Sequence, residues 1–310
     1  MGKMKYILVT GAYGGIGSAV AKMLSERGFC VFALDKRAGA AEKNIIPIAA
    51  DITSEESISA AAETVRKYTD ELFAIVHFAG IYMLDSLVEI DSEAFERIFR
   101  INLFGAFLVN KAFMPLLRYG SRIIMTTSEL APLDPLPFTG IYAVSKSALD
   151  KYAYSLRMEL QLLGISVSVI RAGAVKTTML GVSTDELEKF CGKTKLYSYN
   201  AVRFRNIVDS VEAKSIAPEK MAEKMSAART PKNKKFPIAF FLQRGIFIYV
   251  TLTPKSERYH PNPTVTISRY AIYIKSMTMP CQRLNFLQIT VGTAAISETR
   301  IATGKSRYIF

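Results

Sequence analysis

The stretch Thr10-Gly11-Ala12-Tyr13-Gly14-Gly15-Ile16-Gly17 follows the apolar run Ile7-Leu8-Val9 and precedes a helical pattern that ends near Arg27. Glycines suit such a turn because it is tight and because side chains would hold a bound phosphate away from the backbone. The free N–H groups at the start of the helix, together with the helix dipole, can then bind the anion. The stretch therefore predicts a strand–turn–helix unit that binds the pyrophosphate of a dinucleotide.

An acidic residue, Asp35, ends the next apolar run, about 20 residues beyond the turn. A carboxylate at this place accepts hydrogen bonds from ribose hydroxyls and repels a 2′-phosphate, which favours NAD over NADP. Lys36 and Arg37 follow directly and could hold that phosphate, so NADP is the alternative. We give the carboxylate more weight and predict NAD as the cofactor.

Short apolar runs alternate with amphipathic stretches through the first three quarters of the chain. The expected strands are Tyr6–Val9, Cys30–Leu34, Ile45–Ile48, Leu72–His77, Arg122–Thr127 and Ile165–Ile170. The expected helices are Gly15–Arg27, Glu55–Tyr68, Ala94–Tyr119, Ile141–Leu163 and Pro218–Ala228, whereas residues 178–216 read as irregular. Strands that are apolar throughout are covered on both faces, and strand–helix alternation favours parallel pairing. The pattern predicts an α/β fold with a doubly wound parallel sheet of the Rossmann type.

The basic charge of the chain, +13 overall, belongs to its last quarter. Residues 1–230 hold 28 Lys and Arg against 25 Asp and Glu, whereas residues 231–310 hold 12 against two. We therefore expect a single domain over residues 1–245 and a basic, irregular C-terminal extension over residues 246–310. Charge runs of this kind are usually solvated, so we expect no specific nucleic-acid partner.

The end of the expected domain is apolar. A final strand is expected around Phe236–Phe240, because the edge of the sheet would otherwise be exposed. The whole stretch Phe236–Thr253 is borderline in length for a membrane span, and Arg244 near its middle would be costly in a bilayer. Membrane contact by this region is therefore the weaker alternative to an interfacial or core segment.

Few residues of the chain could form disulfides or bind a metal. The three cysteines are scattered and odd in number, which favours a reducing compartment. With only His77 and His260, paired zinc-binding spacings are missing, so we expect no metal. The first residues, MGKMKYILVT, run straight into a strand and lack the pattern of a signal peptide. We expect a cytoplasmic protein.

Tyr142 and Lys146 lie four residues apart at the start of a long helix, which places the phenol and the ammonium on one face. A free phenol has a pKa of about 10, and a neighbouring cation lowers it, so the pair suits a general acid/base for a hydroxyl or carbonyl. The fifth expected strand ends in hydroxyls at Thr126-Thr127-Ser128. Since ligands bind at the carboxyl ends of such strands, Ser128 can donate to a substrate oxygen.

Three further motifs accompany these residues: Asp51 after the third strand, Asn102 in Ile101-Asn102-Leu103-Phe104-Gly105, and the turn Arg171-Ala172-Gly173-Ala174-Val175-Lys176-Thr177. As an ordered set, the motifs resemble the classical branch of the short-chain dehydrogenase/reductase family, from residue 5 to about residue 230. The stretch 142–177 is similar to hydroxysteroid and retinol dehydrogenase-like members.

The resemblance implies a role for each matching residue. Tyr142 would be the acid/base, Lys146 would bind the nicotinamide ribose and lower the pKa of Tyr142, Ser128 would orient the carbonyl, and Asn102 would hold a water. The implied cofactor-binding set is Thr10, Gly11, Tyr13, Gly15, Ile16, Gly17, Asp35, Asp51, Ile52, Ala79, Gly80, Tyr142, Lys146, Gly173, Val175 and Thr177. The implied reaction is hydride transfer between NAD(H) and an alcohol or ketone.

The chain departs from the family pattern in three places. His77-Phe78-Ala79-Gly80 replaces the usual Asn-Asn-Ala-Gly, and we expect His77 to be a buried neutral histidine. Ala172 replaces a usual proline, which should loosen the turn that follows. Ser128 lies one residue further from Tyr142 than is common in the family, so Thr127 is the alternative candidate for the hydroxyl that orients the carbonyl.

Two alternative functions stay open. Gly11, Gly14 and Gly17 also fit the three-residue spacing of the extended branch of the family, whose members act on nucleotide sugars as epimerases or dehydratases. A protein that senses NAD(P) without catalysis is the other alternative. The filled catalytic positions favour an enzyme.

Residues 178–216 should cover the substrate, and their many apolar and aromatic side chains favour a medium-sized apolar alcohol or ketone. The helices at Ala94–Tyr119 and Ile141–Leu163 carry apolar residues on more than one face, which calls for a second burial surface. Family members pair through these helices, so we expect a homodimer or homotetramer.

Overall fold

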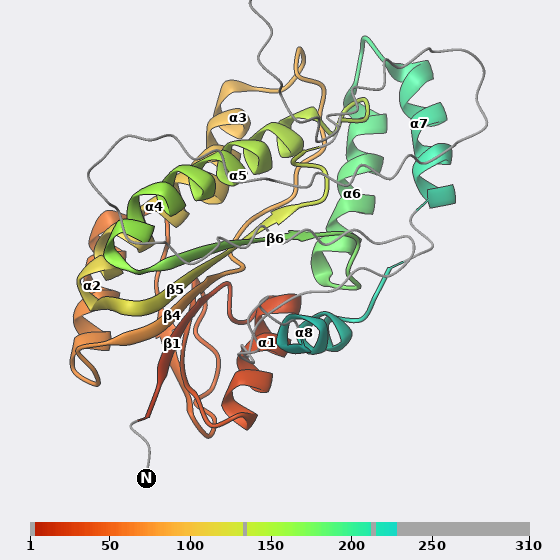
Figure 1. Cartoon of the computed structure of the whole chain (residues 1–310). Coiled ribbons are helices and arrows are strands. Elements are labelled where there is room, and N and C mark those ends of the chain that lie inside the picture. Colours follow the sequence, from red (N-terminus) through yellow and green to blue (C-terminus); the bar gives the residue numbers. More distant parts are fainter. Residues whose placement is uncertain (1–3, 133–134, 212–214, 228–310) are drawn as a thin grey trace, which may run out of the picture. The chain divides into compact units, whose positions relative to one another are not determined.

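The computed structural model describes residues 4–132, 135–211 and 215–227. Six parallel strands form one sheet in the order β3-β2-β1-β4-β5-β6 (Figure 1). The strands are β1 (Tyr6–Thr10), β2 (Cys30–Asp35), β3 (Ile45–Ala49), β4 (Leu72–His77), β5 (Leu117–Ser128) and β6 (Ser166–Ala172). The strand order reverses between β1 and β4, and in sheets of this kind the crevice at that point, at the carboxyl ends, is where ligands bind. The predicted doubly wound parallel sheet is confirmed.

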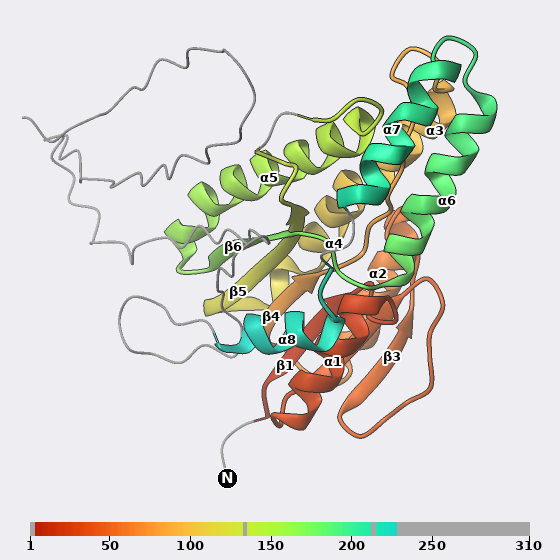
Figure 2. The same ribbon diagram turned by 90° about the vertical axis from the view of Figure 1, so that its right-hand side faces the viewer.

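Helices cover both faces of this sheet. The helices of the described part of the chain are α1 (Gly15–Glu26), α2 (Glu55–Arg66), α3 (Ser92–Phe99), α4 (Gly105–Phe113), α5 (Gly140–Leu160), α6 (Thr178–Lys193), α7 (Ser198–Val211) and α8 (Pro218–Ala227). Helices α2, α4 and α5 pack on one face, and α1 and α8 pack on the other (Figures 1 and 2). Successive residues of a strand point to opposite faces, so Leu8 enters the first layer whereas Ile7 and Val9 enter the second.

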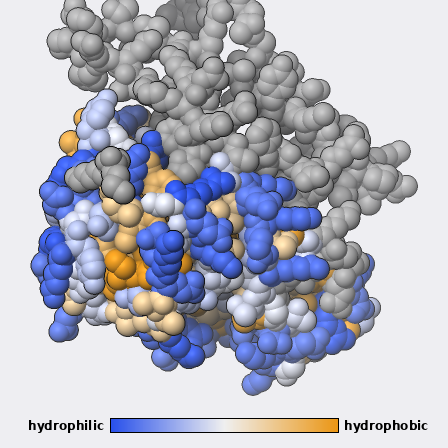
Figure 3. Space-filling view, turned by 90° about the horizontal axis from the view of Figure 1, so that it is seen from below, coloured by the Kyte–Doolittle hydropathy of each residue, from blue (hydrophilic) through white to orange (hydrophobic). Residues whose placement is uncertain are grey.

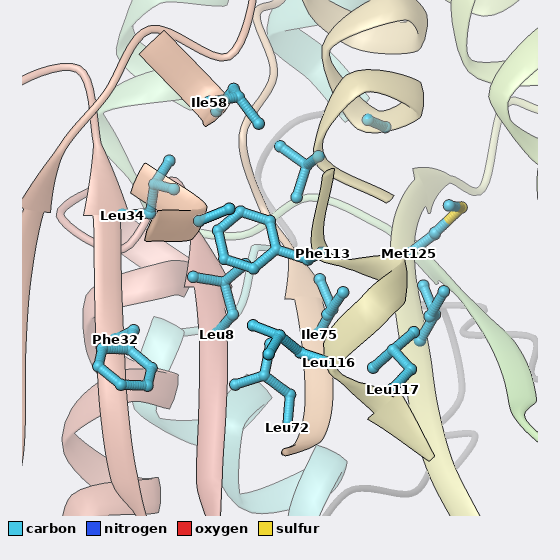
Figure 4. Close-up of a cluster of buried hydrophobic side chains, with 14 of the residues drawn as sticks. Leu8, Phe32, Leu34, Ile58, Leu72, Ile75, Phe113, Leu116, Leu117 and Met125 are labelled. Atoms are coloured by element: carbon cyan, nitrogen blue, oxygen red, sulfur yellow. The ribbon is translucent and has the colours of Figure 1, made fainter. Parts of the chain in front are cut away.

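The larger core lies between the sheet and helices α2, α4 and α5. Phe113 from α4 is fully buried there, and Figure 4 shows its ring among Leu8, Leu34 and Ile75 from three adjacent strands. On the other face, Met221 of α8 is fully buried. The outer surface seen in Figure 3 is mostly hydrophilic over the described residues, with hydrophobic side chains scattered among the hydrophilic ones.

The single helix expected over Ala94–Tyr119 is wrong. The structure has α3, then a π-helical turn over Arg100–Phe104, then α4, and a 3₁₀ turn that contains Pro115. Proline lacks the N–H that would continue the helix, so the chain leaves it here. Strand β5 therefore begins at Leu117, five residues before the expected start, and pairs there with Leu72 of β4.

The irregular segment expected over 178–216 is also wrong, because α6 and α7 occupy most of it. The buried residues of these helices are spaced three apart, Leu187 with Phe190 and Ala201 with Phe204. That spacing is a helical signal, which the surrounding polar residues obscured. The expected helix at Pro218–Ala228 is present as α8.

The expected strand around Phe236–Phe240, the domain boundary at residue 245 and the extension over 246–310 lie outside the described residues. Within the described part of the chain, none of the helices is both long enough and apolar enough to cross a membrane.

Candidate active site

The glycine-rich turn brings the end of β1 against the segment that follows β4. Gly11 has a φ of +64°, and a Cβ atom there would lie 2.6 Å from the backbone nitrogen of Ala79. A Cβ atom at Gly17 would lie 2.0 Å from the carbonyl oxygen of Gly11. Real side chains do not tolerate such approaches, so both positions require glycine. The turn is thereby held close to Ala79 and Gly80, two of the expected cofactor contacts.

The start of α1 is open toward an anion. Gly14 is its N-cap, and among the described residues no side chain caps the helix and no acid lies in its first turn. The first N–H groups of a helix lack partners within the helix, and their partial positive charge favours a phosphate. Gly15 and Thr177 face each other here, because a Cβ atom at Gly15 would lie 2.4 Å from the Thr177 methyl group. The expected contacts Gly15, Ile16, Gly17 and Thr177 therefore share one place, which fits a pyrophosphate.

Two carboxylates follow strands β2 and β3. One oxygen of Asp35 accepts the N–H of Tyr13 at 3.1 Å, which ties the end of β2 to the glycine-rich turn. Asp51 accepts the hydroxyl of Thr53 at 2.7 Å and forms an ion pair with Lys36 at 2.9 Å. These contacts, the Thr53 hydroxyl first, lower the pKa of Asp51 to about 2. Lys36 is thus bound to Asp51.

Asn102 lies inside the π-helical turn between α3 and α4, a feature that is frequent at functional sites. Its amide nitrogen donates to the carbonyl of Ile81 and to the hydroxyl of Ser145, both at 3.0 Å. Its amide oxygen accepts the N–H of Ile81 at 2.8 Å. A Cβ atom at Gly80 would lie 3.1 Å from that oxygen and 3.3 Å from Nζ of Lys146. The π-helix thus places Asn102 between the end of β4 and the start of α5.

Tyr142 lies in the first turn of α5 with 8% of its surface exposed. Burial raises the pKa of its phenol to about 12, while a hydrogen bond with Ser128 acts in the opposite direction. Ser128 is the last residue of β5. The structure therefore brings together the phenol and the hydroxyl that were expected to hold one substrate oxygen.

Lys146 lies one turn further along α5 and is buried, and its ammonium donates to the carbonyl of Thr126 at 3.2 Å. Burial lowers the pKa of Lys146 to about 8. Its Nζ lies 5.8 Å from the centre of the Tyr142 ring. Burial is the largest influence on the pKa of Tyr142 and raises it. The expected lowering of that pKa by Lys146 stays a prediction.

A family model for short chain dehydrogenases matches residues 5–188. The chain belongs to this family. It is 35% identical to estradiol 17-beta-dehydrogenase 2 from Mus musculus over 199 residues, which cover 60% of this chain and 52% of that protein. The chain thus spans about half the length of this curated relative.

Solved structures of the family agree with the fold. A short chain dehydrogenase from Burkholderia cenocepacia, in complex with NADP, is 28% identical, with a TM-score of 0.51 over 56% of this chain and 74% of that chain. A 3-ketoacyl-(acyl-carrier-protein) reductase from Brucella melitensis, complexed with NADH, is 20% identical, with a TM-score of 0.60 over 74% of this chain and 91% of that chain. At that identity the likeness to the Brucella protein concerns the fold alone.

Several features of this short chain dehydrogenase were missed by sequence reasoning. Asp150 of α5 binds Arg171 through two hydrogen bonds, at 2.9 and 2.6 Å, and accepts the hydroxyl of Thr127 at 3.3 Å. Thr127 therefore contacts Asp150, whereas Ser128 contacts Tyr142. Asp150 lies four residues beyond Lys146 on the same helix face, and that spacing could have indicated that Asp150 also faces the end of the sheet.

The turn after β6 is held by a second chain segment. Val175 pairs with Ile216 in an isolated parallel bridge, and the N–H of Lys176 donates to the carbonyl of Ile216 at 2.8 Å. Gly173 precedes this bridge, and Thr177 is the N-cap of α6. The turn that Ala172 was expected to loosen is thus hydrogen-bonded to Ile216 through the residues before and after Val175.

His77 ends β4 and is buried, and one ring nitrogen shares a hydrogen bond with the side chain of Asn110 at 3.0 Å. Asn110 in turn donates to the hydroxyl of Tyr152 at 3.2 Å. Burial lowers the pKa of His77 to about 4. As expected, His77 is neutral near pH 7, and it connects β4 with α4 and α5.

The remaining expected contact, Ile52, packs against Gly105 at the start of α4. A Cβ atom at Gly105 would lie only 2.7 Å from Cδ1 of Ile52. Among the residues that the structure describes, no group of three or more His, Cys, Asp or Glu side chains could hold a metal ion.

Proposed function

We propose that this chain is an NAD-dependent oxidoreductase that interconverts an alcohol and a ketone. The observation that carries the proposal is the convergence of Tyr142, Ser128, Lys146 and Asn102 beside the glycine-rich turn, at the carboxyl edge of β4 and β5. NAD, when bound, supplies or accepts the hydride. The chain's own residues bind the substrate oxygen and move the proton.

Tyr142 acts as the general acid in the reducing direction. With a pKa of about 12, its phenol is protonated near neutral pH and can donate its proton to the carbonyl oxygen as the hydride reaches the carbonyl carbon. In the oxidising direction, the phenol first loses its proton to solvent, and the phenolate oxygen of Tyr142 then takes the proton of the alcohol. The hydroxyl of Ser128, which lies within hydrogen-bonding reach of Tyr142, turns its one proton to the substrate oxygen and holds that oxygen beside the phenol.

Lys146 and Asn102 support this proton transfer from the side of the cofactor. The ammonium of Lys146 lies beside Gly80, an expected cofactor contact, and by the resemblance it can donate to the hydroxyls of the nicotinamide ribose. As a cation near the phenol, Lys146 favours the phenolate that forms when Tyr142 gives up its proton. Asn102 links Ser145 of α5 to the end of β4, so it holds the two sides of the site together.

The preference for NAD over NADP is supported by charge. Asp35 lies at the end of β2, where a carboxylate repels a 2′-phosphate. Lys36, which could otherwise bind that phosphate, is paired with Asp51. The Burkholderia cenocepacia relative is in complex with NADP, which supports a nicotinamide dinucleotide as the cofactor of this chain as well. The preference for NAD over NADP then rests on Asp35 and Lys36.

The proposed substrate is apolar and of medium size. Phe190 of α6 and Phe204 of α7 are buried in an aromatic cluster with Phe138 and Tyr197, next to the segment that leads into the site. We also propose a homo-oligomer that pairs through α4 and α5. Phe107 and Tyr154 on these helices are exposed large apolar side chains in the described structure.

The proposal is tested with Tyr142→Phe, which removes the proton donor but keeps the ring. Substrate candidates are sterols, retinoids and simple secondary alcohols, screened with purified protein and NAD. General acid/base catalysis contributes about 10²–10⁴-fold, so turnover should fall by that order while NADH binding persists. The matched control is Tyr119→Phe, because Tyr119 is 90% exposed near the start of β5, at the opposite end of that strand from Ser128.

A Tyr142→Phe variant that keeps more than about half of the original rate would contradict the proposed role, given the expected loss. NADH binding by the unmodified protein with no turnover on any ketone or alcohol would instead favour the sensing protein. NADP preferred over NAD by the unmodified protein would contradict the reading of Asp35.

A further inference from the structure

The ring of Tyr82 packs directly on the ring of Tyr142. Their centroids lie 4.8 Å apart with the planes tilted by 51°, a favourable aromatic arrangement. Tyr82 follows β4 by five residues and is half-buried. Together with Met83 and Ile141, it surrounds the Tyr142 side chain with apolar atoms. Tyr82 is therefore part of what excludes water from the phenol.

The same chain segment holds the helix pair α6 and α7, which lie side by side in Figures 1 and 2. Asp85 is buried and forms an ion pair with Lys193 at the end of α6. Glu89 accepts the hydroxyl of Thr194 at 2.6 Å and the N–H groups of Lys195 and Leu196 at 2.8 and 3.1 Å. The link between α6 and α7 is thus bound by two carboxylates from the segment that carries Tyr82.

A strained residue joins the two helices to the start of α5. Phe138 has a φ of +65°, which is costly for a bulky side chain and persists only where surrounding contacts compensate. Its ring lies 4.5 Å from that of Phe190 and 5.5 Å from that of Phe204. Its carbonyl accepts the N–H of Asp85 at 3.0 Å. Phe138 and Tyr82 both pack against the apolar cluster of α6 and α7.

We propose that Tyr82 is a positioning residue that holds the phenol of Tyr142 against Ser128, and that the attachment of α6 and α7 holds Tyr82 in turn. This inference rests on the proposed role of Tyr142. Tyr82 does not itself exchange a proton with the substrate.

The groups that face the Tyr142 phenol fix the expected pH effect. They are Ser128 and Glu129 at the end of β5, Lys146 on α5, and the Tyr82 ring. Burial is the largest cause that raises the pKa of Tyr142. Without the Tyr82 ring, water can reach the phenol, and its pKa should move down toward the ordinary value of 10.0.

The test compares Tyr82→Leu with Tyr82→Phe and with the exposed control Tyr119→Leu. We expect Tyr82→Leu to lower kcat by about tenfold, the size of a lost aromatic pair, with NADH binding unchanged. The pH profile of alcohol oxidation should shift to lower pH by about one unit. Tyr82→Phe keeps the ring and should behave like the unmodified protein, as should Tyr119→Leu.

If Tyr82→Leu does not fold, Tyr82→Met serves in its place, because methionine is flexible and apolar and adapts to irregular spaces. An unchanged kcat and pH profile in the folded variant would overturn the inference. So would an equal loss in Tyr82→Phe, because the hydroxyl and not the ring would then be responsible.

The attachment of α6 and α7 is tested with Glu89→Gln. Alone it should raise KM and lower kcat, and its effect on kcat should shrink in a Tyr82→Leu background, because both changes act through one ring. Additive losses would show that the attachment does not act through Tyr82. Retained turnover in Tyr142→Phe would defeat the proposed function itself, whereas loss in Tyr142→Phe with no effect of Tyr82→Leu would defeat this inference alone.

Discussion

A buried histidine should make the stability of this protein sensitive to mild acid. His77 is 4% exposed, and its ring is bonded to Asn110 in the core between β4 and α4. Burial disfavours the charged form, so the pKa of His77 falls from 6.5 to about 4. His77→Asn removes the titratable ring and introduces the residue that the family usually has there.

The direction and the size of the change in the free energy of unfolding with pH follow from proton binding to His77. Between pH 6.5 and about 4, the unfolded chain binds a proton at this side chain that the folded protein does not bind. The free energy of unfolding therefore falls as the pH falls through this window. The difference between the two pKa values corresponds to about 3 kcal/mol in full, and to about 2 kcal/mol between pH 7 and pH 5.

The assay is urea unfolding, followed by circular dichroism, at pH 7 and at pH 5. The unmodified protein should lose about 2 kcal/mol more than His77→Asn over this interval, whatever the absolute stability of the variant. Tyr119→Phe, at a side chain that is 90% exposed, adds or removes no group that titrates between pH 5 and 7, so it is the control and should match the unmodified protein. The reasoning is refuted if His77→Asn and the unmodified protein lose the same amount.

Two further predictions concern the cofactor. Asp35→Ala should relax the preference for NAD, because Arg37 then meets a 2′-phosphate without the competing carboxylate; binding of NADH and NADPH, measured by titration calorimetry, should become more nearly equal. An unchanged ratio of the two affinities would count against it. Gly17→Ala should weaken NADH binding at least tenfold, because its Cβ would meet the Gly11 carbonyl oxygen at 2.0 Å and displace the turn; NADH affinity equal to that of the unmodified protein would contradict this.

Much of the site was predictable because its parts are local. The glycine-rich turn joins one strand to the next helix, and Tyr142 and Lys146 are one helical turn apart, so their neighbours in sequence are their neighbours in space. Ser128 was predictable because parallel strands end at one edge of the sheet. For the same reason, alternating apolar runs and helices predicted the doubly wound sheet.

Other features depend on contacts between distant segments, which no local pattern contains. The π-helical turn of Asn102 forms where that side chain meets Ile81 and Ser145, and α6 is held by the ion pair of Lys193 with Asp85. Strand β5 starts early because Leu117 finds a partner in β4.

The protonation of the site also belongs to the tertiary structure. From the sequence, the neighbouring cation was expected to lower the pKa of Tyr142, whereas burial beneath Tyr82 and its surroundings raises it to about 12. Spacing along a helix determines which groups share a face. The water that those groups lose on folding, which decides their charge, depends on every segment that packs around them.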